Sequence, residues 1–127
     1  MQDRPHPAIL VAATADFIRR EILPLTEGGR YFQLRVALNA LDLVTRQLNL
    51  ADDSDTGEVQ RLEILLGRQG SIEDLNRALC DLIASGEITL ATPGLKDHLW
   101  ATTIAKLAVD QPNYASYRRT LEDEARR

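Results

Sequence analysis

The acidic stretch around residue 55 comes closer than any other part of the chain to the spacing of a metal-binding motif. Counted as a twelve-residue EF-hand calcium loop, it places a glycine at position 6 and a glutamate at position 12. The candidate ligands are Asp52, Ser54, Thr56 and Glu63. Positions 3 and 5 carry neutral hydroxyls, so the ligand charge is low. We expect a solvated acidic turn here, with calcium binding as the alternative.

A second polar set recurs at helical spacing between residues 31 and 50. Drawn as a helix at about 100° per residue, it occupies a strip about 80° wide on an otherwise apolar surface. The members of this polar strip are Arg35, Asn39, Asp42, Arg46 and Asn49. Two arginines on one strip can each hold a carboxylate or phosphate through paired hydrogen bonds. The alternative is that the strip is simply the side that faces solvent.

The remaining reactive side chains stand alone. Cys80 has no second cysteine, His98 has no companion at metal-ligand spacing, and His6 precedes the first expected helix. Lys106 is the single charge in the run 99–109, which is typical of a side chain at the edge of a helical bundle. No glycine-rich phosphate loop or dinucleotide fingerprint follows a strand. The sequence therefore predicts no cofactor and no independent nucleotide-dependent enzyme.

Length and composition indicate a small globular domain. The 127 residues are 44% hydrophobic and 27% charged, with a formal net charge of −4. A chain of this length folds without disulfides or a structural metal. Its net negative charge argues against nucleic-acid binding, which needs a basic face. We expect one helical domain over residues 1–127, located in the cytoplasm and without a membrane span, because no apolar run approaches about 20 residues.

Glycine, proline and cap residues divide the chain into helical segments. Helices are expected over about residues 7–23, 31–50, 58–66, 71–85, 95–109 and from 113 onward. Ser71 caps the fourth of these and Gly86 ends it. The segments 51–57 and 87–94 are expected to be a loop and an irregular connection.

The second expected helix is apolar over about 240° of its circumference, which only a helix packed on several sides can use. No convincing set of strands accompanies these helices. The fold class is therefore all-α, a compact bundle of five to six helices with a central, mostly apolar second helix.

Three stretches of the chain resemble a known family. They are Arg4–Pro7 (RPHP), Tyr31–Leu41 (YFQLRVALNAL) and Leu99–Tyr114 (LWATTIAKLAVDQPNY). In this order they resemble an uncharacterised bacterial family of small helical domains. Members are found beside, or fused to, phosphotransferases of the aminoglycoside-kinase type, often with acyl-CoA dehydrogenases as neighbours. The resemblance spans nearly the whole chain and includes no catalytic signature.

This resemblance implies a non-catalytic accessory subunit. The kinase would phosphorylate the hydroxyl of a hydroxyacyl-CoA, and the dehydrogenase-like enzyme would process the product. The residues implied in contacts with a partner or an anion are Arg35, Asn39, Arg46, Trp100, Lys106 and Tyr114. The cations would face a carboxylate or a CoA phosphate, and Trp100 would anchor the contact. Two alternatives stay open: a free-standing homo-oligomeric bundle that binds an acyl or CoA ligand, and an independent enzyme.

Overall fold

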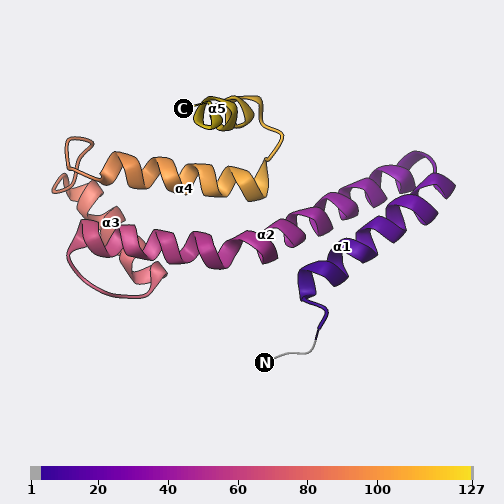
Figure 1. The fold of residues 1–127 in the computed structure, drawn as a ribbon, viewed down its shortest axis with the longest axis horizontal. Coiled ribbons are helices and arrows are strands. Elements are labelled where there is room, and N and C mark those ends of the chain that lie inside the picture. The colour runs from indigo at the N-terminus through magenta and orange to yellow at the C-terminus, as the bar shows by residue number, and fades with distance from the viewer. Residues whose placement is uncertain (1–3, 127) are drawn as a thin grey trace. The chain divides into compact units, whose positions relative to one another are not determined.

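The computed structural model describes residues 4–126, and within them it contains five α-helices and no strand. The helices are α1 (Pro7–Phe17), α2 (Gly28–Leu66), α3 (Ile72–Ser85), α4 (Leu95–Asp110) and α5 (Ala115–Ala125) (Figure 1). A π-helical turn (Ile18–Ile22) and a 3-10 turn (Leu23–Leu25) continue α1. The expected all-α fold class is confirmed. No helix in this described range is long and apolar enough to cross a membrane.

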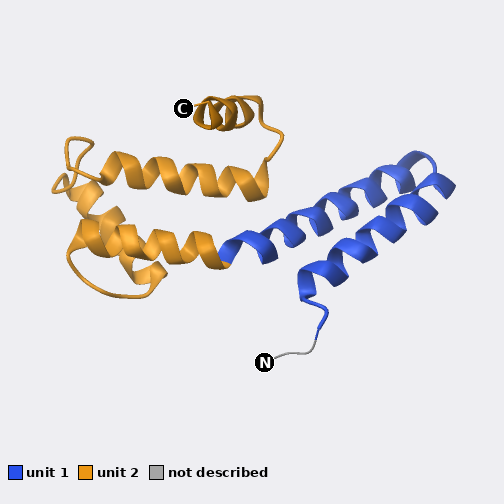
Figure 2. Cartoon of the chain, in the orientation of Figure 1, with its two compact units in different colours: residues 1–51 blue, residues 52–127 orange. Residues whose placement is uncertain are grey.

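The chain forms two compact units, residues 1–51 and 52–127 (Figure 2). The first contains α1 and the part of α2 up to residue 51. The second contains residues 52–66 of α2 together with α3, α4 and α5. The boundary lies inside α2, so each unit is built around its own half of that helix.

Local sequence explains where the first helix begins and ends. Pro7 lies in the first turn, where its missing N–H costs nothing, and the ring of His6 accepts a hydrogen bond from the Ala8 amide at 3.3 Å. Pro24 interrupts the regular helical hydrogen bonds, and the chain leaves the helix at Thr26, whose backbone is extended. The predicted end near residue 23 is therefore confirmed.

The prediction for residues 51–57 is wrong. We expected a loop between two helices, but Gly28–Leu66 is one unbroken helix of 39 residues. Nothing in the segment forces a break, since it contains no proline and a glycine such as Gly57 costs a helix only about 1 kcal/mol relative to alanine. The Thr56 hydroxyl donates to the Asp52 carbonyl at 2.8 Å, one turn back. The acidic side chains therefore lie along a helix and not around a loop.

The caps predicted for the fourth expected helix are confirmed in α3. Ser71 Oγ accepts a hydrogen bond from the Asp74 amide at 3.1 Å, and Gly86 adopts a left-handed φ of 80° at the other end. In the following connection, Ile88 pairs with no strand; its amide donates to the Leu82 carbonyl at 3.1 Å and its side chain is buried.

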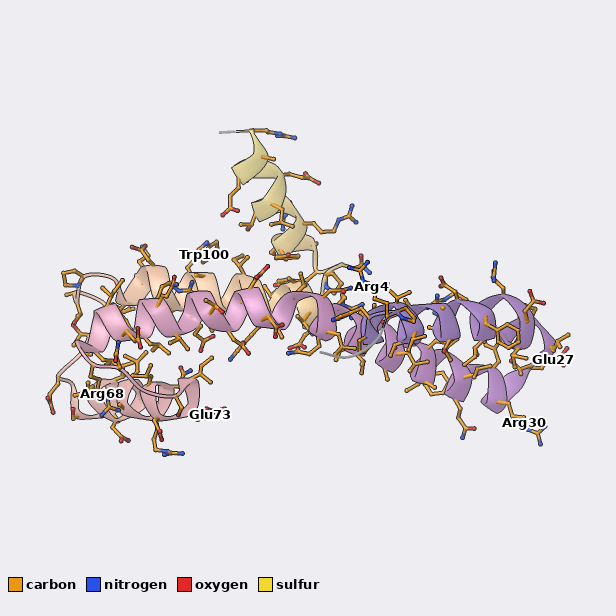
Figure 3. The ribbon with its side chains drawn as sticks, turned by 60° about the horizontal axis from the view of Figure 1, so that its bottom comes forward. Arg4, Glu27, Arg30, Arg68, Glu73 and Trp100 are labelled. Carbon is orange, nitrogen blue, oxygen red and sulfur yellow. The ribbon has the colours of Figure 1, made fainter. Side chains whose placement is uncertain are left out.

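A small apolar core holds three helices of the second unit together. Its members are Leu62 from α2, Leu75 and Leu79 from α3, Ile88 from the next connection and Leu95 from α4. Figures 1 and 3 show α3 and α4 lying beside the last turns of α2. Full burial of one leucine stabilises a fold by about 1.5–3 kcal/mol, so these few side chains dominate the stability of the unit.

The first unit has almost no core. Among residues 4–51, the buried side chains are Ala8, Ala15 and Leu38. The two alanines lie seven residues apart on one side of α1, where their small size allows the helices to approach each other closely.

Replacement of Leu62 by alanine tests the core of the second unit. Leu62 is fully buried, so we expect Leu62→Ala to lower the free energy of unfolding by about 2–5 kcal/mol in urea titrations followed by circular dichroism. Ile64 is 83% exposed two residues later on the same helix, and Ile64→Ala should change the free energy by less than about 0.5 kcal/mol. Equal effects of the two substitutions would contradict the proposed core.

Candidate functional site

A group of polar side chains lies between the helices of the second unit, next to its apolar core. We call it the polar layer; it consists of Glu58 and Arg61 from α2, Asn76 from α3, and His98 and Thr102 from α4. Glu58 Oε1 accepts a hydrogen bond from Asn76 Nδ2 at 2.6 Å, which joins α2 to α3. On α2, Glu58 lies three residues from Arg61 and four from Leu62. On α4, His98 lies three residues from Leu95 and four from Thr102, so these members face the same interior as the two leucines.

His98 is the buried ionisable group of this layer, at 2% exposure. Burial lowers the pKa of His98 below 6.5 because removal from water disfavours the imidazolium. The nearby Glu58 carboxylate opposes this effect, and the Arg61 guanidinium adds to it. The imidazole is therefore neutral at pH 7 and packs between the helices as a polar but uncharged side chain.

Three buried polar atoms in the layer have no hydrogen-bond partner among the described residues. They are Arg61 Nε, His98 Nδ1 and Thr102 Oγ1. A buried donor or acceptor without a partner costs about 1–3 kcal/mol, so the layer lowers the stability of the unit that contains it. A general base must also reach a substrate proton, and the burial of His98 keeps substrates away from its ring in this structure.

The four candidate ligands of the alternative interpretation, a calcium loop, do not surround a common point. Asp52 and Glu63 lie eleven residues apart on one helix, which separates their backbones by about 16 Å. Calcium holds all its ligands at about 2.3–2.6 Å, so Ser54 and Thr56 cannot complete a shell between them. The described residues contain no group of three or more His, Cys, Asp or Glu side chains placed to hold a metal ion.

The polar strip on α2 does not act as one surface. Asp42 faces the π-helical turn that continues α1, where both of its oxygens accept hydrogen bonds from Arg19 Nη2 at 2.9 and 2.8 Å. Arg19 also contacts Asp16 at 2.8 Å, so one guanidinium joins two carboxylates from two helices. Asp42 is thus half-exposed and at the same time paired with a cation of another helical segment. Sequence reasoning missed Arg19 because its partner lies 23 residues away on another helix.

The other members of the strip are distributed around this contact. Arg35 is exposed, and its guanidinium lies 5.9 Å from the centroid of the Tyr31 ring, within cation–π range. Asn39 and Asn49 are exposed, whereas Arg46 is half-buried. Arg35 and Arg46 therefore do not form a ready-made site that could hold one anion between them.

The late candidate residues lie on the outer surface of the second unit. Trp100 is 54% exposed and Leu99 40% exposed on α4, and Figure 3 shows Trp100 on the side of α4 that faces away from α3. Lys106 is also exposed, and Tyr114, 51% exposed, follows in the turn before α5. The exposed residues of one side of α4 form the α4 surface: Lys96, Leu99, Trp100, Thr103, Lys106 and, in the last turn, Asp110.

Two shallow hollows adjoin the turn between α2 and α3. One, of about 430 Å³, is lined by Arg68, Gln69, Gly70, Asp74, Arg77, Ala78 and Asp81. Its cations are already engaged, since Arg77 pairs with Asp74 at 3.2 Å and Arg68 donates to the Asp74 carbonyl at 3.2 Å. The other, of about 590 Å³, contains Glu63 and the exposed Ile64. Neither hollow contains the residues implied in partner or anion binding.

By its fold and its side chains, this chain is an all-α protein with a buried polar layer and exposed apolar helix faces. The model of a family described as a domain of unknown function, DUF6285, matches residues 24–114. This is most of the chain, which therefore belongs to that family. The match begins after α1 and ends before α5, and it includes the six residues implied in partner or anion binding. No curated protein and no solved structure matches the chain.

The polar layer predicts that acid destabilises the protein through His98. As pH falls below about 6.5, the unfolded chain binds a proton that the folded chain does not, so the free energy of unfolding falls by up to about 1.4 kcal/mol per pH unit. This loss continues until the pH passes the lowered pKa of the folded state. Urea titrations between pH 5 and 8 measure the slope.

The slope, and not the absolute stability, is the diagnostic quantity. In His98→Gln the side chain stays neutral, and we expect this part of the pH dependence to disappear. His6→Gln changes an exposed histidine at the start of α1 and is the matched control. An unchanged slope in His98→Gln would contradict the role assigned to burial of the imidazole.

Proposed function

We propose that this protein is a non-catalytic accessory subunit of an aminoglycoside-phosphotransferase-like kinase that acts on a hydroxyacyl-CoA. The observation that carries the proposal is the exposure of Trp100, at 54%, beside Leu99 on the outer side of a helix. The family match supports membership of a family whose function is open, and the kinase partner comes from the resemblance of three sequence stretches.

An exposed tryptophan on a well-anchored helix is typical of a protein–protein contact. Tryptophan is among the residues most enriched in the energetic centres of interfaces, where water is excluded around it. The opposite side of α4 is held in the second unit by Leu95, His98 and Val109, all buried. The tryptophan therefore projects from a rigid element, which lowers the entropy lost on binding.

The charges around Trp100 indicate the kind of surface that would dock there. Lys96 and Lys106 lie on the same side of α4 as the tryptophan, and both are exposed. Lysines at the rim of an apolar contact favour a partner surface with carboxylates and increase the association rate. The same cations would also suit the phosphates of a CoA carried by the kinase.

Several features support an accessory role over independent catalysis. His98 is shielded from solvent, which keeps substrates away from its ring. The phosphate and magnesium ligands that phosphoryl transfer requires are carried by kinases themselves. In this proposal an acyl-CoA dehydrogenase uses the phosphorylated product, and the small chain stabilises the kinase or completes its acyl-CoA site.

Replacement of Trp100 tests the docking surface directly. With the kinase as partner, Trp100→Ala should weaken binding by at least about 30-fold in calorimetric titrations, because truncation of such an anchor costs about 2 kcal/mol or more. Ile64→Ala removes a more exposed apolar side chain outside the α4 surface and should leave binding unchanged. Kinase turnover that is identical with and without the chain would remove the accessory role altogether.

A second candidate is a free-standing homo-oligomer that binds an acyl or CoA ligand. The exposed apolar side chains of the first unit favour its self-association. For the ligand, this candidate expects acyl-CoA at about 1 mM to raise the melting temperature of the purified chain, since a ligand that binds the folded state stabilises it. An unchanged melting temperature would contradict this candidate and leave the kinase proposal intact.

A further inference from the structure

The first unit leaves one side of its longer helix uncovered. Within residues 4–51, the neighbour of α2 is α1, and Figure 2 shows the two as a helical hairpin. Leu38 is buried and Asp42 is paired with Arg19, so these two residues mark the side of α2 that faces α1. A two-helix hairpin is rarely enough to bury apolar faces of this width.

The amount of exposed apolar surface in this unit is large. Its large apolar side chains with 37% to 81% exposure are Ile9, Leu10, Phe17, Ile22, Leu25, Tyr31, Phe32, Val36, Leu43, Val44, Leu48 and Leu50. At about 200 Å² for each fully exposed side chain, they present on the order of 1,000 Å² of apolar surface. This total is spread over both helices of the hairpin, whereas the largest contiguous patch on a typical monomer is about 300–600 Å².

Four of these side chains form a row along α2. The outer row consists of Phe32, Val36, Leu43 and Leu50, which are 68%, 52%, 37% and 41% exposed. It lies about 120–160° around the helix from Leu38, on the side away from α1. Val36, Leu43 and Leu50 recur every seven residues, and Phe32 lies four residues before the first of them. This spacing is the pattern of a seam between two packed helices.

The residues beside the outer row suit a second copy of the same surface. Asn39 flanks the row on one side and Gln47 on the other, and both are exposed. An amide donates and accepts hydrogen bonds, so it can pair with an identical amide. The row itself is uncharged, and the nearest charge is that of the half-buried Arg46, which lies at the edge of the row beside Asn39.

We propose that the outer row is the seam of a homodimer, in which the α2 helices of two copies pack against each other. Two such hairpins together form a four-helix bundle, in which each α2 gains the second neighbour that its apolar surface requires. A two-fold dimer uses the same surface on both copies. A typical stable interface buries about 800 Å² per partner; at about 200 Å² for each fully exposed side chain, the outer row supplies about 400 Å² of this area, and the residues that flank it supply the rest.

This interface does not depend on the kinase partner. The outer row belongs to the first unit and Trp100 to the second, so self-association and kinase docking use different side chains. The dimer and the accessory role can therefore fail separately, and Trp100→Ala should remain dimeric.

Light scattering after size-exclusion chromatography measures the mass of the purified full chain in solution. We expect the wild-type protein at about 100 μM to have twice the mass of one chain. Leu43→Asp places a charge in the seam and should halve this mass. Leu99→Asp introduces the same charge at a leucine of matching exposure, 40% against 37%, on the α4 surface, and it should leave the mass unchanged.

A measurement on the unmodified protein covers the case in which Leu43→Asp also loses helical structure. Dimer dissociation coupled to unfolding makes the melting temperature rise with concentration, and we expect this rise over a 100-fold dilution series of the wild type. A monomeric wild type, a dimeric Leu43→Asp or a loss of the dimer only in Leu99→Asp would each overturn the proposal. The last outcome would assign self-association to the α4 surface.

Discussion

The need of α2 for neighbouring helices on more than one side is the constraint on which both units depend. Over residues 31–50 its apolar arc is about 240° wide, which no single neighbouring helix covers, so this part of the helix needs at least two partners. In the second unit α3 and α4 meet this need through Leu62 and the side chains around it. In the first unit α1 covers one side, and the outer row remains in contact with solvent. The same helix is therefore well packed in one half and incompletely packed in the other.

The two units also differ in how their polar groups are satisfied. In the first, the Arg19–Asp42 pair is half-exposed, so water still solvates both charges and the pair contributes about 1 kcal/mol at most. In the second, His98 is enclosed and neutral at pH 7, and its neighbours Arg61 and Thr102 each have a buried atom without a hydrogen-bond partner in the described part of the chain. Such a layer determines which helices pack together, and it adds little to the stability of their contact.

The sequence was most informative where structure is decided within a few residues. Ser71 and Gly86 predicted both ends of α3 because a cap acts on amides and carbonyls one turn away. The loop predicted for residues 51–57 was wrong. The prediction relied on Asp, Ser and Thr side chains, which favour turns because they bind nearby backbone groups. Here the Thr56 hydroxyl bonds one turn back, and the helix continues into turns that Glu58 and Leu62 anchor to α3 and α4.

In the candidate site too, features that depend on nearby residues could be predicted, whereas contacts with other helices could not. Helical spacing identified the polar strip, and the family resemblance identified Trp100, which the structure places at the surface. The partners of His98 and Asp42 could not be predicted, because each lies on another helix and no local pattern links them. Packing between helices decides which of several equivalent polar side chains becomes buried.

The Arg19–Asp42 ion pair crosses the start of the family match. Asp42 lies inside the matched segment, residues 24–114, whereas Arg19 lies in the helical segment that precedes it. In a relative with a different N-terminal segment, an aspartate at position 42 would have no cation at position 19 to pair with. Residues 19 and 42 should therefore vary together among relatives, and an aspartate at position 42 should be rare where no basic side chain is available to reach it.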